Sequence, residues 1–206
     1  MKSAVVNERA IEYAFIFNCL KELNPETLLD VGTGVTALPS LLDIHIPNVY
    51  AMDNITDYWP NGMTNPHFEV MDDDITDPKF EGPVDVITCI SVLEHIVDEE
   101  QAVRSMIKLL RPGGKLLLTV PYKHDEHVPD AYQITKTERP YICKMYADED
   151  VQRWKSYGMM FDHAEYWRVW GGVYWGQGHR CKPVMSNSPE IGHQLACIQF
   201  TKVVPS

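Results

Sequence analysis

Two glycines in a short loop give the first indication of chemistry in this chain. Gly32 and Gly34 flank Thr33 directly after a short apolar run, and Ala37 and Asp53 follow at the spacing of a G-x-G-x-x-A nucleotide-binding fingerprint. Glycine adopts a positive φ at little cost, and without a Cβ it lets a ligand approach the backbone closely. The loop therefore predicts a nucleotide-like ligand, and its neighbours must decide which one.

Two aspartates beside this loop narrow the choice of ligand. Asp30 lies two residues before Gly32 and is expected to face the loop, where a carboxylate repels a pyrophosphate but attracts an ammonium or sulfonium group. Asp53 closes a second apolar run, in the stretch YAMDN that ends at Asn54, and its carboxylate can accept hydrogen bonds from both ribose hydroxyls. We therefore expect an adenosine with a positively charged tail and no phosphate, as in S-adenosylmethionine.

A third acidic stretch, MDDDITD, supplies a place for the adenine. Asp74, followed by the apolar Ile75, can pair the amino group of the base and its neighbouring ring nitrogen. Asp72 and Asp73 are then expected to be solvated or to cap the loop. Three adjacent aspartates can also bind a hard cation, but neighbouring side chains on a strand diverge, which disfavours a metal here.

The elements that must position these residues follow from the hydrophobic periodicity. Helical spacing predicts helices at residues 7–23, 35–44, 99–110 and 147–158, with Pro39 tolerable only in a first turn and RPGG (111–114) as a tight turn. Short apolar or alternating runs predict strands at residues 27–31, 48–53, 67–71, 84–90, 115–121, 163–170 and 195–203. The alternation predicts an α/β fold, a Rossmann-like three-layer sandwich whose seven-stranded sheet is mostly parallel with an antiparallel C-terminal strand. Ligands of such sheets bind beyond the carboxyl ends of the strands, where every residue above is expected to lie.

Composition and charge exclude several classes of protein. The 206 residues suit a single domain spanning residues 1–206, and no apolar run is long enough to cross a membrane. The net charge of −11 disfavours nucleic acid as a partner. The N-terminus lacks the core of a signal peptide, so a cytoplasmic location is expected. The five cysteines are scattered, without a C-x-x-C pair, which predicts neither a zinc ribbon nor a disulfide framework.

Five stretches occur in an order that resembles a known family. They are LLDVGTG, YAMDN, DDITD, VDVITCISVLEHI and LLRPGGKLLLTVPY, and together they cover about residues 25–122. In this they resemble the class I S-adenosylmethionine-dependent methyltransferases of the type-11 kind. ERAIEY and ITCISVLEHI also resemble members associated with cell-surface glycan or lipopolysaccharide gene sets. The resemblance implies that residues 25–122 form the cofactor-binding core.

The resemblance implies a role for each residue of a cofactor site. By resemblance, the backbone of Gly32 and Gly34 contacts the methionine portion, and Asp53 holds the ribose. Asp74 and Ile75 hold the adenine. The backbone of Cys89 and Ile90, at the end of strand four, receives the amino group of the methionine portion. Asp30 would orient that amino group, directly or through water. Thr36 stands where the family commonly has a third glycine, so the following helix is expected to pack slightly differently.

The residues just past strand four are candidates for the chemistry itself. Methyl transfer is an in-line displacement, so the enzyme mainly aligns the acceptor, although an oxygen acceptor can also need a base. His95 is the best candidate for that base, because imidazole titrates near neutrality, whereas a structural role in the loop is the alternative. Some quinone O-methyltransferases carry a metal-linked E-x-x-E-H here, but this chain has Ser91 in place of the first acid, so no metal is predicted.

The acceptor site is expected in residues 122–146 and 170–194. Tyr122, directly after strand five, is predicted to touch the acceptor. His124 and His127 could bind a metal or place a second base, but solvated side chains in an acidic loop are the preferred interpretation. The aromatic, glycine-rich tail after Trp170 could form a lid, a sugar-stacking wall or a homodimer contact.

The sequence as a whole predicts a methyltransferase that acts on a small molecule. The preferred reaction is O-methylation of a polar or sugar-like acceptor, with S-adenosylmethionine as the cofactor. A non-catalytic S-adenosylmethionine-binding or scaffold protein is one alternative. A second alternative is a nicotinamide-dependent oxidoreductase or epimerase, which is disfavoured by Asp30 and by the lack of a Tyr-x-x-x-Lys dyad. A third is a nucleic-acid or protein methyltransferase, which is disfavoured by the negative net charge and by the lack of an Asn-Pro-Pro-Tyr-type motif.

Overall fold

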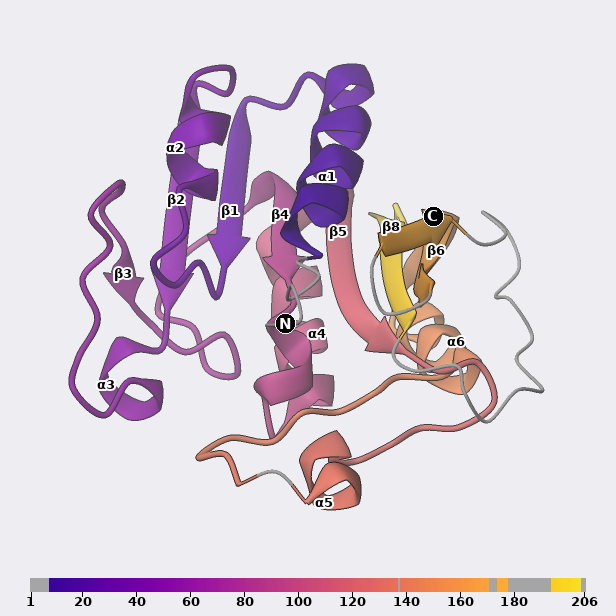
Figure 1. The fold of residues 1–206 in the computed structure, drawn as a ribbon. Helices are drawn as coiled ribbons and strands as arrows, with labels where there is room; N and C mark the ends of the chain where they lie inside the picture. The colour runs from indigo at the N-terminus through magenta and orange to yellow at the C-terminus, as the bar shows by residue number, and fades with distance from the viewer. Residues whose placement is uncertain (1–7, 137, 171–173, 178–193, 205–206) are drawn as a thin grey trace.

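The strands of this chain form one mixed sheet, as seen in a computed structural model that describes residues 8–136, 138–170, 174–177 and 194–204 (Figure 1). The strands are β1 (Thr27–Val31), β2 (Asn48–Asp53), β3 (Met71–Asp72), β4 (Val84–Ile90), β5 (Leu110–Tyr122), β6 (Met159–Trp170), β7 (Tyr174–Gln177) and β8 (Gln194–Lys202). The helices are α1 (Arg9–Leu23), α2 (Leu38–Asp43), α3 (Ile55–Tyr58), the 3-10 turn η1 (Leu93–His95), α4 (Glu99–Leu109), α5 (Ala131–Thr135) and α6 (Asp148–Ser156). As predicted, Pro39 lies in the first turn of its helix.

The strands of the sheet run in the predicted directions. Its strand order is β3-β2-β1-β4-β5-β8-β6-β7, and each pair from β3 to β5 is parallel. β8 runs antiparallel to both of its neighbours, β5 and β6. The prediction of a mostly parallel α/β sheet with an antiparallel C-terminal strand is therefore confirmed. All seven predicted strands are present, and β7 adds a short edge strand that pairs antiparallel with β6 inside a segment expected to be a loop.

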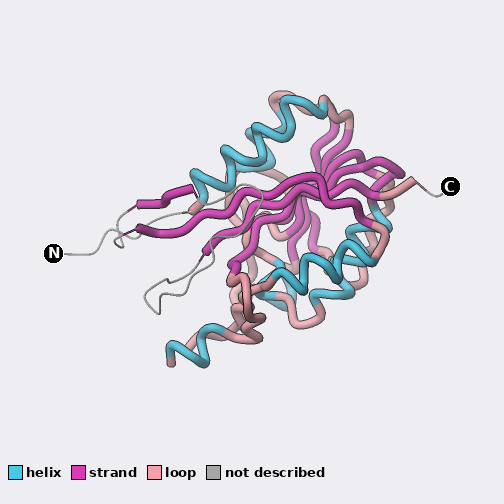
Figure 2. Tube along the Cα trace, turned by 90° about the vertical axis from the view of Figure 1, so that its right-hand side faces the viewer, coloured by secondary structure: helices cyan, strands magenta, loops and turns pink. Residues whose placement is uncertain are grey.

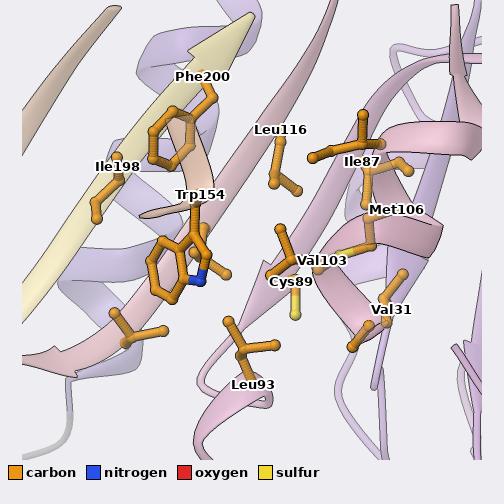
Figure 3. Close-up of a cluster of buried hydrophobic side chains, with 14 of the residues drawn as sticks. Val31, Ile87, Cys89, Leu93, Val103, Met106, Leu116, Trp154, Ile198 and Phe200 are labelled. Carbon is orange, nitrogen blue, oxygen red and sulfur yellow. The ribbon is translucent and has the colours of Figure 1, made fainter. Parts of the chain in front are cut away.

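Helices cover both faces of the sheet and produce three layers (Figure 2). On one face, Phe15 and Ile16 of α1 pack with Leu42 of α2 against the sheet, and on the other α4 and α6 cover a larger core. Figure 3 shows that second core, where Trp154 of α6 lies near Phe200 of β8 with their ring centroids 6.5 Å apart. Strands buried on both faces need apolar side chains at successive positions, which is why the central strands read as continuous apolar runs.

The third predicted strand, residues 67–71, is wrong in extent. Only Met71 and its successor pair with β2, and the residues before them fold over the glycine loop instead. The Asn65 side chain causes this. Its Nδ2 donates to the Gly34 and Thr36 carbonyls at 2.8 and 2.9 Å, and its Oδ1 accepts from the backbone N–H groups of His67 and Phe68. Backbone donors satisfied by a side chain no longer need a strand partner.

The predicted tight turn at residues 111–114 is part of β5. Val84 pairs with Leu110 and Val86 with Lys115, so β5 carries extra residues opposite β4 and bulges without leaving the sheet. The Arg111 Nε donates to Asp85 Oδ1 at 2.7 Å and holds the bulge against β4. The RPGG residues are thus part of a strand that runs without a break from the end of α4 to Tyr122.

No helix among the described residues is both long and apolar enough to cross a membrane.

Candidate active site

A cavity of about 580 Å³ lies beyond the carboxyl ends of β1, β2, β3 and β4, whose arrowheads point to the same edge of the sheet (Figure 1). α1 contributes Arg9 to its wall, and the loop after β4 contributes Ser91, Val92 and His95. The residues predicted from the glycine loop, YAMDN and DDITD also line it, namely Gly32, Thr33, Gly34, Asp53, Asn54, Asp74 and Ile75. One cavity therefore gathers most of the predicted site, as expected for the switch point of such a sheet.

The glycine loop, residues 32–34, lines the cavity and packs closely on the loop after β4. Gly32 and Gly34 have φ values of +71° and +54°, which side chains with a Cβ rarely adopt. A Cβ on Gly32 would lie 2.4 Å from both γ-carbons of Val92, so this glycine lets the loop after β1 pack directly on the loop after β4. A Cβ on Gly34 would meet Trp59 at 3.6 Å, which is an ordinary contact. Gly32 is thus required by packing as well as by φ.

Asp53 at the end of β2 ties this loop to the cavity wall. Its Oδ2 accepts from the Gly34 N–H at 2.8 Å, and its Oδ1 accepts from the indole Nε1 of Trp59 at 2.8 Å. Burial raises the pKa of this carboxyl above its ordinary value, and the two donated hydrogen bonds oppose that rise. Each carboxylate oxygen has a second lone pair, so Asp53 keeps acceptor capacity for hydroxyls of a ligand.

In the MDDDITD stretch, Asp74 and Ile75 line the cavity, whereas Asp72 and Asp73 cap backbone N–H groups. Asp74 Oδ1 accepts from the Thr76 N–H and hydroxyl, both at 2.8 Å, and Asn54 Nδ2 donates to Asp74 Oδ2 at 3.2 Å. Asp72 accepts from the first N–H groups of α3, and Asp73 accepts from backbone N–H groups of Asp74, Lys79 and Phe80. The prediction that Asp72 and Asp73 cap the loop is confirmed, although Asp73 also reaches the cavity lining.

Three residues predicted for the cofactor site, Asp30, Cys89 and Ile90, are not among the residues that line this cavity, although Asp30 and Ile90 line a smaller pocket that shares residues with it. Their contacts with the cofactor stay predictions. Asp30 is 2% exposed and lies behind the loop, where it accepts hydrogen bonds from the hydroxyls of Thr33 and Thr88. Burial raises the pKa of Asp30 to about 6. Cys89 is fully buried in the core, and the Ile90 carbonyl accepts from Arg9 Nη1 at 3.0 Å. Asp30 thus supports the glycine loop through Thr33, and the Ile90 carbonyl holds Arg9 beside the cavity.

Residues that the sequence interpretation missed complete the cavity. Arg9 is the only lysine or arginine among the described residues that line it, whereas Asp53, Asp73, Asp74 and Asp98 all do. Such a lining opposes a pyrophosphate and suits a ligand with cationic groups and one carboxylate. The available signal for Arg9 was its position three residues before Glu12, the spacing of a helical ion pair, which the structure shows at 2.9 Å. Trp59 carried no comparable signal in sequence.

His95 lines the cavity with a defined tautomer. Its Nδ1 lies 2.7 Å from the Ile142 carbonyl oxygen, and because a carbonyl only accepts, Nδ1 carries the proton of the neutral ring. The Nε2 lone pair is then available to accept a proton. Burial lowers the pKa of His95 below its ordinary value, although the carbonyl opposes this, so the neutral form is favoured. The Tyr141 ring lies edge-on to the imidazole at 4.9 Å.

Residues 141–146, here named the 141–146 strap, hold the loop after β4 in place. The Lys144 N–H donates to the Glu94 carbonyl at 2.9 Å, and Lys144 Nζ donates to the Val97 carbonyl at 2.7 Å. The buried Tyr146 hydroxyl donates to the Leu93 carbonyl at 2.9 Å. With the His95 bond to Ile142, the strap pairs with the whole turn that carries the candidate base.

Tyr122 is not at the cavity, contrary to the expectation that it touches the acceptor. Its side chain is buried in the core beside Tyr166, at 4.9 Å between ring centroids, and its hydroxyl lies 3.2 Å from His124 Nδ1. His127 pairs instead with the buried Asp150 at 2.9 Å. The two histidines therefore have separate partners, and among the described residues no group of three or more His, Cys, Asp or Glu side chains is arranged to hold a metal.

Comparison with protein families identifies the class of this site. Residues 7–177 match the model of a family described as a methyltransferase domain. The chain belongs to the methyltransferase domain family. Residues 7–177 therefore form a methyltransferase domain. The family predicted from the five stretches is thereby confirmed.

Curated relatives match only part of this methyltransferase. A ubiquinone biosynthesis O-methyltransferase from Marinobacter nauticus is 25% identical over 93 residues, which are 44% of this chain and 37% of the relative. The enzyme of the same name from Xanthomonas oryzae pv. oryzae is 33% identical over 64 residues, 31% of this chain and 25% of the relative. The chain thus spans well under half the length of these relatives.

Solved structures share the fold over most of the chain. The N-methyltransferase NodS from Bradyrhizobium japonicum, in complex with S-adenosyl-l-homocysteine, has a TM-score of 0.61 and 16% identity and covers 95% of this chain and 87% of its own. The 1,6-didemethyltoxoflavin-N1-methyltransferase from Burkholderia thailandensis has a TM-score of 0.63 and 13% identity and covers 96% of this chain and 80% of its own. At these identities the likeness shows the fold.

Proposed function

We propose that this methyltransferase binds S-adenosylmethionine in the 580 Å³ cavity and methylates an oxygen of a small polar or sugar-like acceptor. One observation carries the proposal. The same cavity presents the carboxylates of Asp53 and Asp74 together with a neutral imidazole, His95, whose Nε2 lone pair is not used by the contact with Ile142. Acidic groups suit the nucleoside and its cationic tail, and the imidazole suits a hydroxyl that must lose its proton.

The lining fits the cofactor part by part. Asp53 would accept the ribose hydroxyls, Asp74 and Ile75 would hold the adenine, and Gly32 with Arg9 would receive the amino-acid end. The close packing of Gly32 on Val92 leaves a backbone floor that a larger residue would fill. When bound, the cofactor supplies a methyl carbon activated by an adjacent sulfonium. Asp30 supports the glycine loop through Thr33 in this proposal, rather than contacting the cofactor.

His95 would act as the general base for the acceptor. The Ile142 carbonyl keeps the proton on Nδ1, so Nε2 is the nitrogen that takes the hydroxyl proton. Tyr58 and Tyr141 lie around the imidazole, with ring centroids 6.4 and 4.9 Å from it, and Tyr58 lines the cavity. An aromatic wall of this kind favours a flat or sugar-like ring that can stack on it. This arrangement supports an oxygen acceptor on a small ring.

The names of the relatives are consistent with more than one acceptor atom. The curated relatives are O-methyltransferases of ubiquinone biosynthesis, whereas the two solved structures are N-methyltransferases. The choice of oxygen rests on His95, because a neutral amine already has the lone pair that attacks, whereas a hydroxyl gains most from a base. A cytoplasmic location and a homodimer through the aromatic tail also stay proposals, and most of that tail lies outside the described residues.

Calorimetry and a turnover screen test the proposal. Titration with S-adenosylhomocysteine and with nicotinamide dinucleotides should show binding of the first alone, because of the acidic lining. Incubation with S-adenosylmethionine and a panel of sugars, phenols and amines, followed by mass spectrometry, should show methylation of a hydroxyl. Exclusive methylation of amines would overturn the oxygen assignment. Cofactor binding without turnover of any acceptor would favour the scaffold alternative.

A further inference from the structure

Glu12 on α1 is a buried carboxylate for which the proposed function gives no role. Its side chain is 0% exposed, far from the usual place of a glutamate. Three donors surround it. Oε2 accepts from Arg9 Nη1 at 2.9 Å, and Oε1 accepts from the hydroxyls of Ser91 and Thr119 at 2.5 and 2.7 Å. A buried charge with three donors is built into the fold, because a buried carboxylate without them would be strongly destabilising.

Two of these three donors belong to residues that line the cavity. Arg9 contacts both Glu12 and the Ile90 carbonyl, so its guanidinium is held against the end of β4. Ser91 has a φ of 50°, a left-handed conformation that is unfavourable for a serine, and its N–H donates to the Thr119 carbonyl at 3.0 Å. Glu12 and Thr119 thus hold Ser91 in a strained conformation at the start of the loop that carries His95.

We infer that Glu12 is a positioning residue for the amino-acid end of the cofactor, acting through Arg9 and Ser91. The inference rests on the proposed cofactor site. A guanidinium binds a carboxylate well only when the plane of the guanidinium is fixed. The ion pair with Glu12 fixes the guanidinium plane of Arg9. The Ser91 contact sets where the strand-four loop begins. α1 therefore contributes to the site although Glu12 lies 79 residues before Ser91 in the sequence.

A carboxylate suits this position for a chemical reason. An amide in its place would lose the charge that pairs with Arg9, and its NH₂ group would face either the guanidinium, which cannot accept, or two hydroxyls that would have to turn from donors into acceptors. Glu12→Gln keeps size and shape while breaking the pairing with Arg9 or with Ser91. This substitution therefore separates positioning from packing.

Asp150 provides a matched control elsewhere in the molecule. Its side chain is also 0% exposed, and its carboxylate accepts from Arg153 at 2.5 Å and from the Ala147 N–H at 2.7 Å. Unlike Arg9 and Ser91, neither of these residues lines the cavity, and nor does His127, the third partner of Asp150. Asp150→Asn removes an equally buried charge beside an arginine and should lower the melting temperature without changing cofactor affinity.

The test uses two ligands that differ only at the amino-acid end. Calorimetry of the full chain with S-adenosylhomocysteine should show affinity about tenfold weaker or more in Glu12→Gln, as expected for losing a hydrogen bond to a charged group. Affinity for 5′-methylthioadenosine, which lacks the amino acid, should stay within about twofold of the unsubstituted protein. A general loosening of the site would weaken both ligands together, and that result would overturn the inference.

Ser91→Gly keeps the test decisive if Glu12→Gln does not fold. Glycine adopts the same φ without strain, so this variant removes only the hydroxyl that meets Glu12. It should also weaken S-adenosylhomocysteine selectively, and unchanged affinity would contradict the inferred role. If the unsubstituted protein binds no S-adenosylhomocysteine at all, the proposed cofactor site itself is wrong. Binding that neither Glu12→Gln nor Ser91→Gly alters would leave that site standing and remove only the role of Glu12.

Discussion

The loop after β1 and the loop after β4 follow adjacent parallel strands and meet at the same cavity, but they are held in different ways. The first takes its shape from its own residues, since Gly32 and Gly34 provide the two positive φ angles. The second begins with a left-handed serine, Ser91, and is held by groups far away in sequence. These groups are Glu12 on α1, Thr119 on β5 and the 141–146 strap.

The two loops therefore differ in how their shapes can be recognised from the sequence. A loop that depends on glycine is visible in any window of a few residues, because only glycine tolerates that backbone and that close approach. A loop held by distant partners has no local signature, since serine at φ 50° is unfavourable without them. Changes in the first loop should therefore affect cofactor affinity. In the second loop, changes at Ser91 should also affect cofactor affinity, whereas changes at His95 should affect turnover.

His95→Ala should have the largest effect and tests the second loop directly. Loss of a general base typically lowers kcat by about 10²–10⁴-fold, while affinity for S-adenosylhomocysteine should change little. Since burial lowers the pKa of His95, the base is unprotonated at neutral pH, and kcat/KM should fall only as the pH drops through a value below 6.5. His124→Ala, which alters a histidine away from the cavity, serves as the control. Equal losses of turnover and affinity would make His95 a structural residue.

Gly32→Ala should have the next largest effect and tests the first loop. The new Cβ would lie 2.4 Å from Val92 and would need a strained φ of +71°, costing about 2–4 kcal/mol in cofactor binding or stability. Gly62→Ala is a matched control, because Gly62 has the same φ and nothing within 4 Å of the added Cβ. It should cost about 1 kcal/mol in stability and leave affinity unchanged. Wild-type affinity in Gly32→Ala would show that the loop is not the cofactor floor.

Asp53→Ala should weaken S-adenosylhomocysteine binding by about 1–3 kcal/mol, because buried hydroxyls of the ligand and the Gly34 N–H would lose their acceptor. Isothermal titration measures this directly. Trp59→Phe is the useful comparison, since it removes the indole donor to Asp53 but keeps an aromatic ring and the carboxylate, and it should have a smaller effect. Unchanged affinity in Asp53→Ala would assign the ribose to another residue.

Tyr146→Phe should have the smallest effect and tests whether the 141–146 strap supports catalysis. Removing the hydroxyl that donates to Leu93 should cost about 1 kcal/mol of stability and lower the melting temperature by about 2–4 °C. We expect kcat to fall severalfold while cofactor affinity is retained. Tyr122→Phe removes another buried hydroxyl that does not touch this loop, so it should leave kcat unchanged. A fall in kcat for Tyr122→Phe would restore the original catalytic prediction for Tyr122.

The sequence predicted the fold and much of the proposed cofactor site because both depend on local patterns. Apolar runs alternating with helical periods predict parallel strands, and the residues after those strands share one edge of the sheet. Gly32, Asp53 and Asp74 line one cavity for this reason. The predicted extent of strand three was wrong because backbone N–H groups before Met71 donate to the side chain of Asn65 and not to a neighbouring strand.

The remaining error concerns which way a group faces. Tyr122 was placed near a ligand because it directly follows strand five, yet its side chain packs on Tyr166. Asp30 faces the glycine loop as expected, since its carboxylate accepts from Thr33 in that loop and from Thr88 on β4. Position along a strand predicts the edge of the sheet at which a residue lies. Only the packed neighbours decide whether its side chain reaches the cavity or the core.

The sequence by itself thus determined the class of sheet, the edge at which ligands bind and the glycine loop, since these follow from backbone preferences and the period of apolar residues. Tertiary structure alone decided the tautomer of His95 and the conformation of Ser91, together with the place of Arg9. Those features depend on Ile142, which lies 47 residues beyond His95, and on Glu12, which lies 79 residues before Ser91. No local pattern encodes such contacts, because they exist only once the strands have been brought together.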